Sequence, residues 1–171
     1  INADNESIVD DEKGDKDDMD RRVISVAYDS KTHDPLGFSA QIYIHVKNHN
    51  FKQIVLHLGL IYISPKAQGK SISYLLAMLP NILLMLKSGL RCTWVSNVTQ
   101  VPAVLGLVDK NYSNTYPSAK PDHPQTFMHK KLTELIMKNH RHDFGVGCDA
   151  VLDLEQQIIQ NAYIRSSKYP F

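Results

Sequence analysis

A short basic loop stands between a run of apolar residues and a long apolar segment, and its residue types suit an anion. The loop contains Lys66 and Lys70, and Gly69 allows a ligand to approach the backbone closely. The segment that follows, Ser71 to Lys87, is predicted to be a helix. The first N–H groups of a helix have no partner within it and carry the positive end of its dipole, so this junction favours a phosphate group.

The glycine patterns of two common nucleotide-binding loops are absent from this loop. A dinucleotide-binding fold needs G-x-G-x-x-G, and a Walker loop needs G-x-x-x-x-G-K-[ST]. The sequence therefore predicts a phosphate-bearing ligand outside these two classes.

One histidine of the apolar run before the loop is a candidate proton acceptor. His57 lies between Leu56 and Leu58, and histidine titrates near neutral pH, which suits a general base. A buried histidine with a purely structural role explains the same residue, and we favour that alternative.

Metal binding is not predicted. His140 to Asp143 is the densest group of potential ligands, but zinc sites usually need four and no second cluster is evident. Cys92 and Cys148 have no further Cys or His at zinc-finger spacing. The run Asp15 to Asp20 lacks the glycine and glutamate of a calcium loop.

Charge and length set further bounds on the function. The 171 residues suit one domain with a formal net charge of +1. Residues 1–20 contain nine acids and two lysines, a net of −7, so residues 21–171 carry +8. We interpret residues 1–20 as an acidic lead or linker, and residues 21–171 as one domain.

Neither a membrane nor a nucleic acid is expected as a partner. The apolar stretch Ile72 to Leu86 is about 15 residues long, contains Pro80, and falls short of the roughly 20 residues of a membrane span. Lys130, Lys131 and Lys138 resemble a solvated helix face more than a nucleic-acid patch. The sequence shows no basic-then-apolar signal pattern, and its two cysteines are too few for a disulfide framework, so we expect an intracellular, cytoplasmic protein.

Hydrophobic periodicity predicts an α/β (α+β) chain. Its apolar residues alternate between Leu36 and Val46, as in a strand with one buried face. The helix from Ser71 to Lys87 is apolar all round, so we expect it to be deeply packed, and Pro80 to kink or split it. The other predicted strands are 23–28, 53–63, 91–95 and, with less support, 151–154 and 158–164; the other predicted helices are 101–110 and 126–139.

This order of elements resembles the A motif of the GNAT acetyltransferase superfamily. Ile63-Ser64-Pro65 matches an isoleucine or valine two residues before a proline, and Gln68 to Ser73 stands where the family has Q/R-x-x-G-x-G/A before a leucine-rich helix. Trp94 to Asn97 resembles the next strand–helix unit of the family. The resemblance covers Val23 to about Pro117 and is carried mainly by the order of elements.

The resemblance implies a mixed, mostly antiparallel sheet flanked by helices, and an acyl-CoA-dependent N-acyltransferase. Such an enzyme transfers an acetyl group from acetyl-CoA to a small-molecule or peptide amine. Ile61 and Ile63 would contact the pantetheine arm of coenzyme A, with the N–H near Ile61 facing the thioester carbonyl, and Asn97 would also contact that arm. The backbone of the loop would bind the pyrophosphate, through Gln68, Gly69, Lys70, Ser71, Ile72 and Ser73.

The chain departs from the family pattern at two places that matter for catalysis. Ser71 and Ser73 replace the glycines of the loop. Val104 and Leu105 stand where many members have the tyrosine that protonates the leaving thiolate, so Tyr112 is the substitute candidate. A GNAT-fold domain that binds CoA or a partner without catalysis is therefore the alternative, and an unrelated nucleotide-binding α/β protein is a third possibility.

Overall fold

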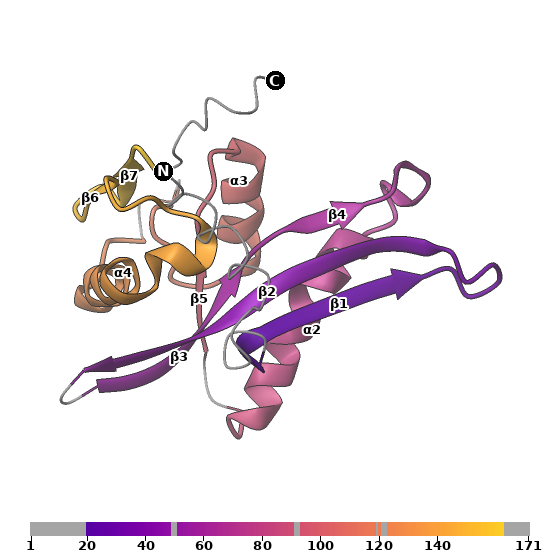
Figure 1. Ribbon diagram of the computed structural model, residues 1–171, viewed down its shortest axis with the longest axis horizontal. Coiled ribbons are helices and arrows are strands. Elements are labelled where there is room, and N and C mark those ends of the chain that lie inside the picture. Colours follow the sequence, from indigo (N-terminus) through magenta and orange to yellow (C-terminus); the bar gives the residue numbers. More distant parts are fainter. Residues whose placement is uncertain (1–19, 49–50, 91–92, 119, 121–122, 163–171) are drawn as a thin grey trace, which may run out of the picture. The chain divides into compact units, whose positions relative to one another are not determined.

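The computed structural model describes residues 20–48, 51–90, 93–118, 120 and 123–162 (Figure 1). Five strands form one sheet in the order β1-β2-β3-β5, and β4 pairs with β2. The strands are β1 Arg22–Tyr28, β2 Pro35–Asn48, β3 Phe51–Leu58, β4 Ile61–Ile63 and β5 Trp94–Asn97, with a separate hairpin of β6 Val151–Asp153 and β7 Ile158–Gln160. The helices are α2 Ile72–Lys87, α3 Pro102–Asn111 and α4 Phe127–His140, with 3-10 turns η2 Pro65–Ala67 and η3 Arg141–Phe144.

The predicted fold class is confirmed. The pairs β1–β2, β2–β4 and β6–β7 are antiparallel, and helices accompany the sheet. The order of elements from β1 to α3 is the order that the GNAT resemblance predicts. The chain divides into two compact units. The first unit runs up to Tyr43 and includes Leu56–Val95; the second includes Ile44–Val55 and the chain from Ser96 on.

The strands predicted at the start of the described chain, over 23–28 and 36–46, are confirmed, and together they form an antiparallel hairpin. β1 and β2 pair from Arg22 opposite Ile42 to Tyr28 opposite Pro35. Asp29 closes the turn, because its Oδ1 accepts hydrogen bonds from the backbone N–H groups of Lys31 and Thr32 at 2.8 and 3.1 Å. An aspartate that binds the backbone of its own turn stabilises that turn locally.

The prediction of one long strand over 53–63 is wrong in one respect. The strand is interrupted after Leu58 and resumes at Ile61. Two backbones approach each other closely at this interruption. A Cβ atom at Gly59 would lie 2.3 Å from the carbonyl oxygen of Ala40, a distance that no side chain tolerates. Pairing with β2 nevertheless continues, because the N–H of Ala40 donates to the carbonyl oxygen of Leu60 at 2.8 Å.

Helix α2 runs through Pro80 without a break, so the predicted split does not occur. Proline has no N–H and leaves the carbonyl four residues earlier, that of Leu76, without its usual partner. Ser39 and Gln41 of β2 take over this role: Ser39 Oγ and Gln41 Nε2 donate to the Leu76 carbonyl oxygen at 3.1 and 3.3 Å. The strand thereby satisfies a buried carbonyl that would otherwise be costly.

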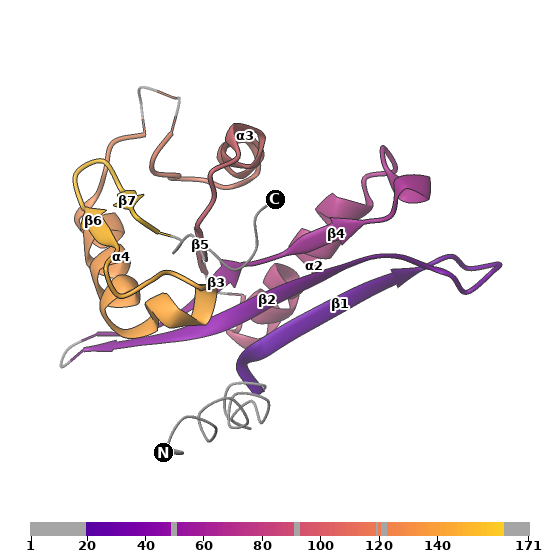
Figure 2. The same cartoon turned by 45° about the horizontal axis from the view of Figure 1, so that its top comes forward.

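In the part of the chain that the structure describes, only one side of α2 is buried, which corrects the expectation of a deeply packed helix. Leu76, Ala77, Pro80 and Leu84 are buried where α2 packs beside β1 and β4 (Figure 1, Figure 2). The opposite side is apolar and exposed. In the described part of the chain, no helix combines the length and apolar character that crossing a membrane requires.

The second unit contains α3, α4 and the β6–β7 hairpin. The helix predicted over 126–139 is confirmed as α4, with Thr126 as its N-cap: the Thr126 hydroxyl accepts from the N–H of His129, and His129 Nδ1 accepts from the N–H of Thr126. Leu132, Leu135 and Ile136 form the buried face of α4, whereas Phe127, which the apolar pattern of this helix would also place there, is 77% exposed.

Candidate functional site

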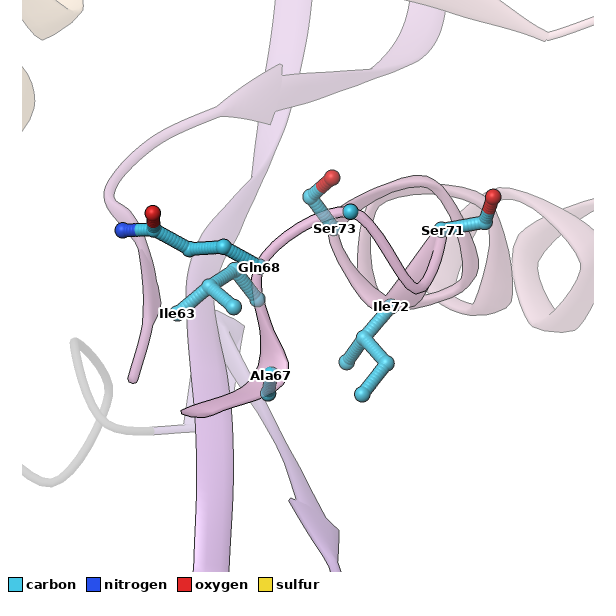
Figure 3. Close-up of a pocket in the computed structure, with 7 residues that line it drawn as sticks. Ile63, Ala67, Gln68, Ser71, Ile72 and Ser73 are labelled. Atoms are coloured by element: carbon cyan, nitrogen blue, oxygen red, sulfur yellow. The ribbon is translucent and has the colours of Figure 1, made fainter. Parts of the chain in front are cut away.

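The loop between β4 and α2 surrounds a hollow of about 160 Å³ (Figure 3). Two residues of this loop have a left-handed backbone: Gly69 with φ 76° and Ser71 with φ 58°. Figure 3 shows the side chains of Ser71 and Ser73 at the start of α2, with Ile72 pointing the other way. The residues that line the hollow are Ile63, Ala67, Gln68, Gly69, Ser71, Ile72 and Ser73.

Ser71 keeps a glycine-like conformation although it has a side chain. Its φ of 58° and ψ of 13° lie in the region where an L-residue costs about 1 to 2 kcal/mol. It is the N-cap residue of α2, yet its side chain makes no capping hydrogen bond. The first N–H groups of α2 therefore have neither an intrahelical partner nor a cap from Ser71, and they suit an anionic group.

The edge of β4 that faces away from β2 presents backbone hydrogen-bonding groups. Two backbone hydrogen bonds show which residue pairs between β2 and β4 are bonded. The N–H of Ala40 donates to the carbonyl oxygen of Leu60, and the N–H of Ser64 donates to that of Leu36, both at 2.8 Å. Since bonded and non-bonded pairs alternate, Ile61 and Ile63 direct their N–H and C=O groups away from β2. Among the described strands, none pairs with β4 on that side.

Positive charge stands on the loop, with one acid nearby. Lys66 and Lys70 are exposed. The backbone N–H groups of Lys31 and Thr32 hold the pKa of Asp29 below its usual 3.8, and the charge of Lys70 acts in the same direction. Asp29 is therefore a carboxylate at neutral pH and offsets part of the positive potential near Lys70.

The structure brings together most of the predicted cofactor-binding residues. Six of them line the hollow: Ile63, Gln68, Gly69, Ser71, Ile72 and Ser73. Ile61 lies two residues earlier on β4, and Lys70 lies on the loop between Gly69 and Ser71. Ala67, a buried residue of η2, also lines the hollow; sequence reasoning missed it because alanine carries no polar group to draw attention.

The other predicted site residues lie elsewhere. His57 is on β3 and only 3% exposed, which suits the structural role favoured above. Asn97 ends β5 and Tyr112 follows α3; both are half-buried and belong to the second unit.

The histidine-rich segment forms a polar cluster. Asp143 contacts two imidazoles, His140 Nδ1 at 3.0 Å and His142 Nε2 at 3.4 Å. Within the residues that the structure describes, no group of three or more His, Cys, Asp or Glu side chains is arranged to hold a metal ion.

Known proteins provide a comparison for the fold. No family model and no curated protein sequence matches this chain. Among solved structures, it is similar to an acetyltransferase from Trypanosoma brucei, with 16% identity over 60% of this chain and 69% of that chain and a TM-score of 0.44. It is also similar to the glucosamine-6-phosphate N-acetyltransferase of Arabidopsis thaliana, with 14% identity over 63% of this chain and 68% of that one and a TM-score of 0.43.

A third similar structure is an aminoglycoside N-acetyltransferase in complex with CoA. It shares 12% identity over 53% of this chain and 66% of its own length, with a TM-score of 0.39. Identities at this level concern the fold alone.

Proposed function

We propose that this chain binds acyl-CoA along β4 and the following loop, and transfers the acyl group, most simply acetyl, to an amine. The observation that carries the proposal is the outer edge of β4, which leads directly into the hollow at the start of α2. An extended ligand with amide groups at one end and phosphates at the other fits this sequence of backbone groups.

The two ends of the site suit the two ends of such a ligand. Ile61 and Ile63 each offer a donor and an acceptor, about 7 Å apart along the strand, which suits the amides of a pantetheine arm. The hollow of about 160 Å³ is smaller than the roughly 300 Å³ at which pockets begin to enclose whole ligands, so it suits a phosphate-sized group. Lys66 and Lys70 supply the positive charge that a pyrophosphate favours.

The chemistry is an acyl transfer. The lone pair of a neutral amine attacks the thioester carbonyl carbon; a C–N bond forms, the C–S bond breaks, and the thiolate leaves. The N–H of Ile61 would stabilise the negative charge that develops on the carbonyl oxygen. A base removes the proton of the attacking nitrogen and an acid protonates the thiolate; His57 and Tyr112 are the candidates that the sequence offers for these two roles.

A second candidate function is CoA binding without catalysis. Two observations favour it. His57 is buried within β3, where it is poorly placed to exchange protons with a substrate. Val104 and Leu105, at the positions where a tyrosine acid is expected, are both apolar residues of α3.

Calorimetric titration with acetyl-CoA and with CoA tests the binding step. We expect binding of both ligands, and competition by CoA but not by ATP or NAD. If neither CoA ligand binds, both candidate functions are wrong; if ATP or NAD binds in their place, an unrelated nucleotide-binding protein is favoured.

A turnover assay then separates the two candidates. Release of free thiol from acetyl-CoA is followed over a panel of small and peptide amines. Under the first candidate, H57Q lowers kcat while the Kd for CoA stays unchanged, and H45Q, a change at an exposed histidine of β2, has no effect. Y112F is compared with Y28F in the same way. Binding without thiol release for any amine supports the second candidate.

A further inference from the structure

The hollow at the start of α2 has an apolar side as well as a polar one. Ile63, Ala67 and Ile72 line it with hydrocarbon side chains. Figure 3 shows Ile72 directed toward the side on which Ala67 lies, while the hydroxyls of Ser71 and Ser73 point away from it. A phosphate group gains nothing from contact with methyl groups, so the apolar side suits a neighbouring part of the ligand.

The polar side of the hollow is the first turn of α2. The N–H of Leu75 donates to the carbonyl oxygen of Ser71 at 3.2 Å, which is the first hydrogen bond of the helix. The N–H groups of Ile72, Ser73 and Tyr74 come before it and have no partner within α2. These donors at one helix end match the oxygens of a single phosphate group.

The charge of the loop also matches one phosphate group. Lys66 and Lys70 are positive, and the carboxylate of Asp29, which interacts with Lys70, offsets part of their charge. A phosphate monoester carries about −1.5 to −2 at neutral pH. CoA has a pyrophosphate and a further phosphate, roughly twice that charge, which these three side chains balance only in part.

The order of these features matches one chemical group. Phosphopantetheine has an amide, then a quaternary carbon with two methyl groups, then a phosphate. In the chain, the outward-facing backbone groups of Ile63 lead into the apolar lining, and the N–H groups of α2 follow. In a nucleotide the group beside the phosphate is a ribose, whose hydroxyls would lose their water against isoleucine and alanine side chains.

We infer that the site recognises the acyl-phosphopantetheine part of its donor and leaves the adenosine part of CoA unbound. This inference rests on the proposed acyl transfer and narrows its donor. The acetyl thioester of phosphopantetheine therefore replaces acetyl-CoA. The amine nitrogen bonds to the acetyl carbon, the C–S bond breaks, and phosphopantetheine leaves as its thiol with the proton that the amine gives up.

Calorimetric titration of the full chain with the parts of CoA tests this division. We expect the Kd of phosphopantetheine to lie within about fivefold of that of CoA. Pantetheine lacks the phosphate and should bind at least about tenfold more weakly than phosphopantetheine. Adenosine bisphosphate, the other half of CoA, should not displace phosphopantetheine from the chain.

A pair of variants tests the apolar lining. I72V and I72T have side chains of nearly the same shape, but threonine places a hydroxyl where valine has a methyl group. I72T should therefore bind CoA and phosphopantetheine at least about fivefold more weakly than I72V does. V108T makes the valine-to-threonine change at a half-buried position of α3 and should leave both Kd values unchanged.

Several results would overturn the inference and leave the proposed function intact. The first is a CoA affinity more than about fivefold above that of phosphopantetheine, and the second is displacement of phosphopantetheine by adenosine bisphosphate. Pantetheine that binds as tightly as phosphopantetheine, or I72T that binds as tightly as I72V, would also contradict it. If neither CoA nor phosphopantetheine binds, the proposed function itself is wrong. Circular dichroism shows whether each variant is folded, and the fragment series decides the matter if I72T is not.

Discussion

The hydroxyl of Ser39 donates a hydrogen bond of 3.1 Å to the carbonyl oxygen of Leu76, a residue 37 positions later in the chain. This carbonyl is the one that Pro80 cannot serve. Gln41 Nε2 donates to the same oxygen at 3.3 Å, and Tyr43 Oη donates to the carbonyl oxygen of Pro80 at 3.2 Å. Three alternate residues of one strand thus complete the hydrogen bonding in the middle of the helix.

The first prediction concerns the hydrogen bond that Ser39 donates to Leu76 in place of the N–H that Pro80 lacks. S39A should lower the free energy of unfolding by about 1 kcal/mol, the usual net worth of a buried hydrogen bond. The loss should be smaller in a P80A background, where the restored N–H of residue 80 can bond to Leu76. Urea unfolding of the four proteins of this double-mutant cycle gives the coupling energy.

Ser25 provides the control for this cycle, since it is a buried serine on the neighbouring strand. S25A combined with P80A should show no coupling. Equal losses for S39A in both backgrounds would show that Ser39 acts independently of the proline.

The second prediction concerns the strained residue of the loop. S71G should raise the free energy of unfolding by about 1 kcal/mol, because glycine adopts a φ of 58° without the penalty of a Cβ atom. Under the proposed function it should also bind CoA at least as tightly as the wild-type chain. Thermal unfolding and calorimetric titration measure the two effects.

S73G is the matched comparison, two residues further on. Ser73 is the second residue of α2 and has no positive φ for glycine to relieve, so S73G should lower stability by about 0.5 kcal/mol. The two substitutions should therefore change the melting temperature in opposite directions; a decrease for both would contradict the assignment of strain to Ser71.

The third prediction concerns the charge of the loop. The double change K66A/K70A should weaken CoA binding by about tenfold, and the remaining affinity should depend less on salt, because exposed charges attract phosphates over distances limited by screening. K87A removes another exposed lysine, from the far end of α2, and serves as the control. If K87A weakens binding as much as the double change does, the phosphates do not lie at the loop.

The fourth prediction concerns alkaline stability. Burial raises the pKa of Tyr43 above its usual 10.0. In the unfolded chain this tyrosine loses its proton at lower pH than in the folded chain, so its contribution to stability is complete below 10.0 and is lost as the pH rises through the folded value. Y43F should cost about 1 kcal/mol at neutral pH, for the bond to Pro80, and this difference should shrink at alkaline pH.

Urea unfolding from neutral pH to above 10.0 measures this trend for both proteins. A difference between wild type and Y43F that stays constant over the whole range would mean that Tyr43 does not contribute to the alkaline transition.

Local patterns in the sequence predicted the elements whose stabilising contacts are also local. The alternation from Leu36 to Val46 predicted the strand β2, and hydrophobic periodicity over 126–139 predicted the helix α4. The close approach at Gly59 was not predictable in this way, because it involves the carbonyl oxygen of Ala40 on another strand. Composition predicted a deeply packed α2, whereas the described residues cover only one of its sides, because burial depends on neighbours that are distant in the sequence.

In the candidate site, too, the sequence predicted what depends on neighbouring residues and not what depends on distant ones. A motif located the loop from Gln68 to Ser73, since a phosphate loop and the helix that follows it are contiguous in sequence. The direction of the backbone groups of Ile61 and Ile63 depends on the phase of hydrogen bonding with β2, which no residue type specifies. His57 is buried because it lies on β3, and its burial depends on the neighbouring parts of the fold rather than on its own residue type.

Close contact between β2 and β4 also limits how far sequences of this fold can diverge. A Cβ atom at Gly37 would lie 2.6 Å from the carbonyl oxygen of Tyr62, just as one at Gly59 would meet Ala40. Replacement of either glycine would force the two strands apart and move the open edge of β4. Relatives of this chain should therefore retain glycine at both positions, and the spacing G-x21-G is an evolutionary signature that should outlast overall sequence identity.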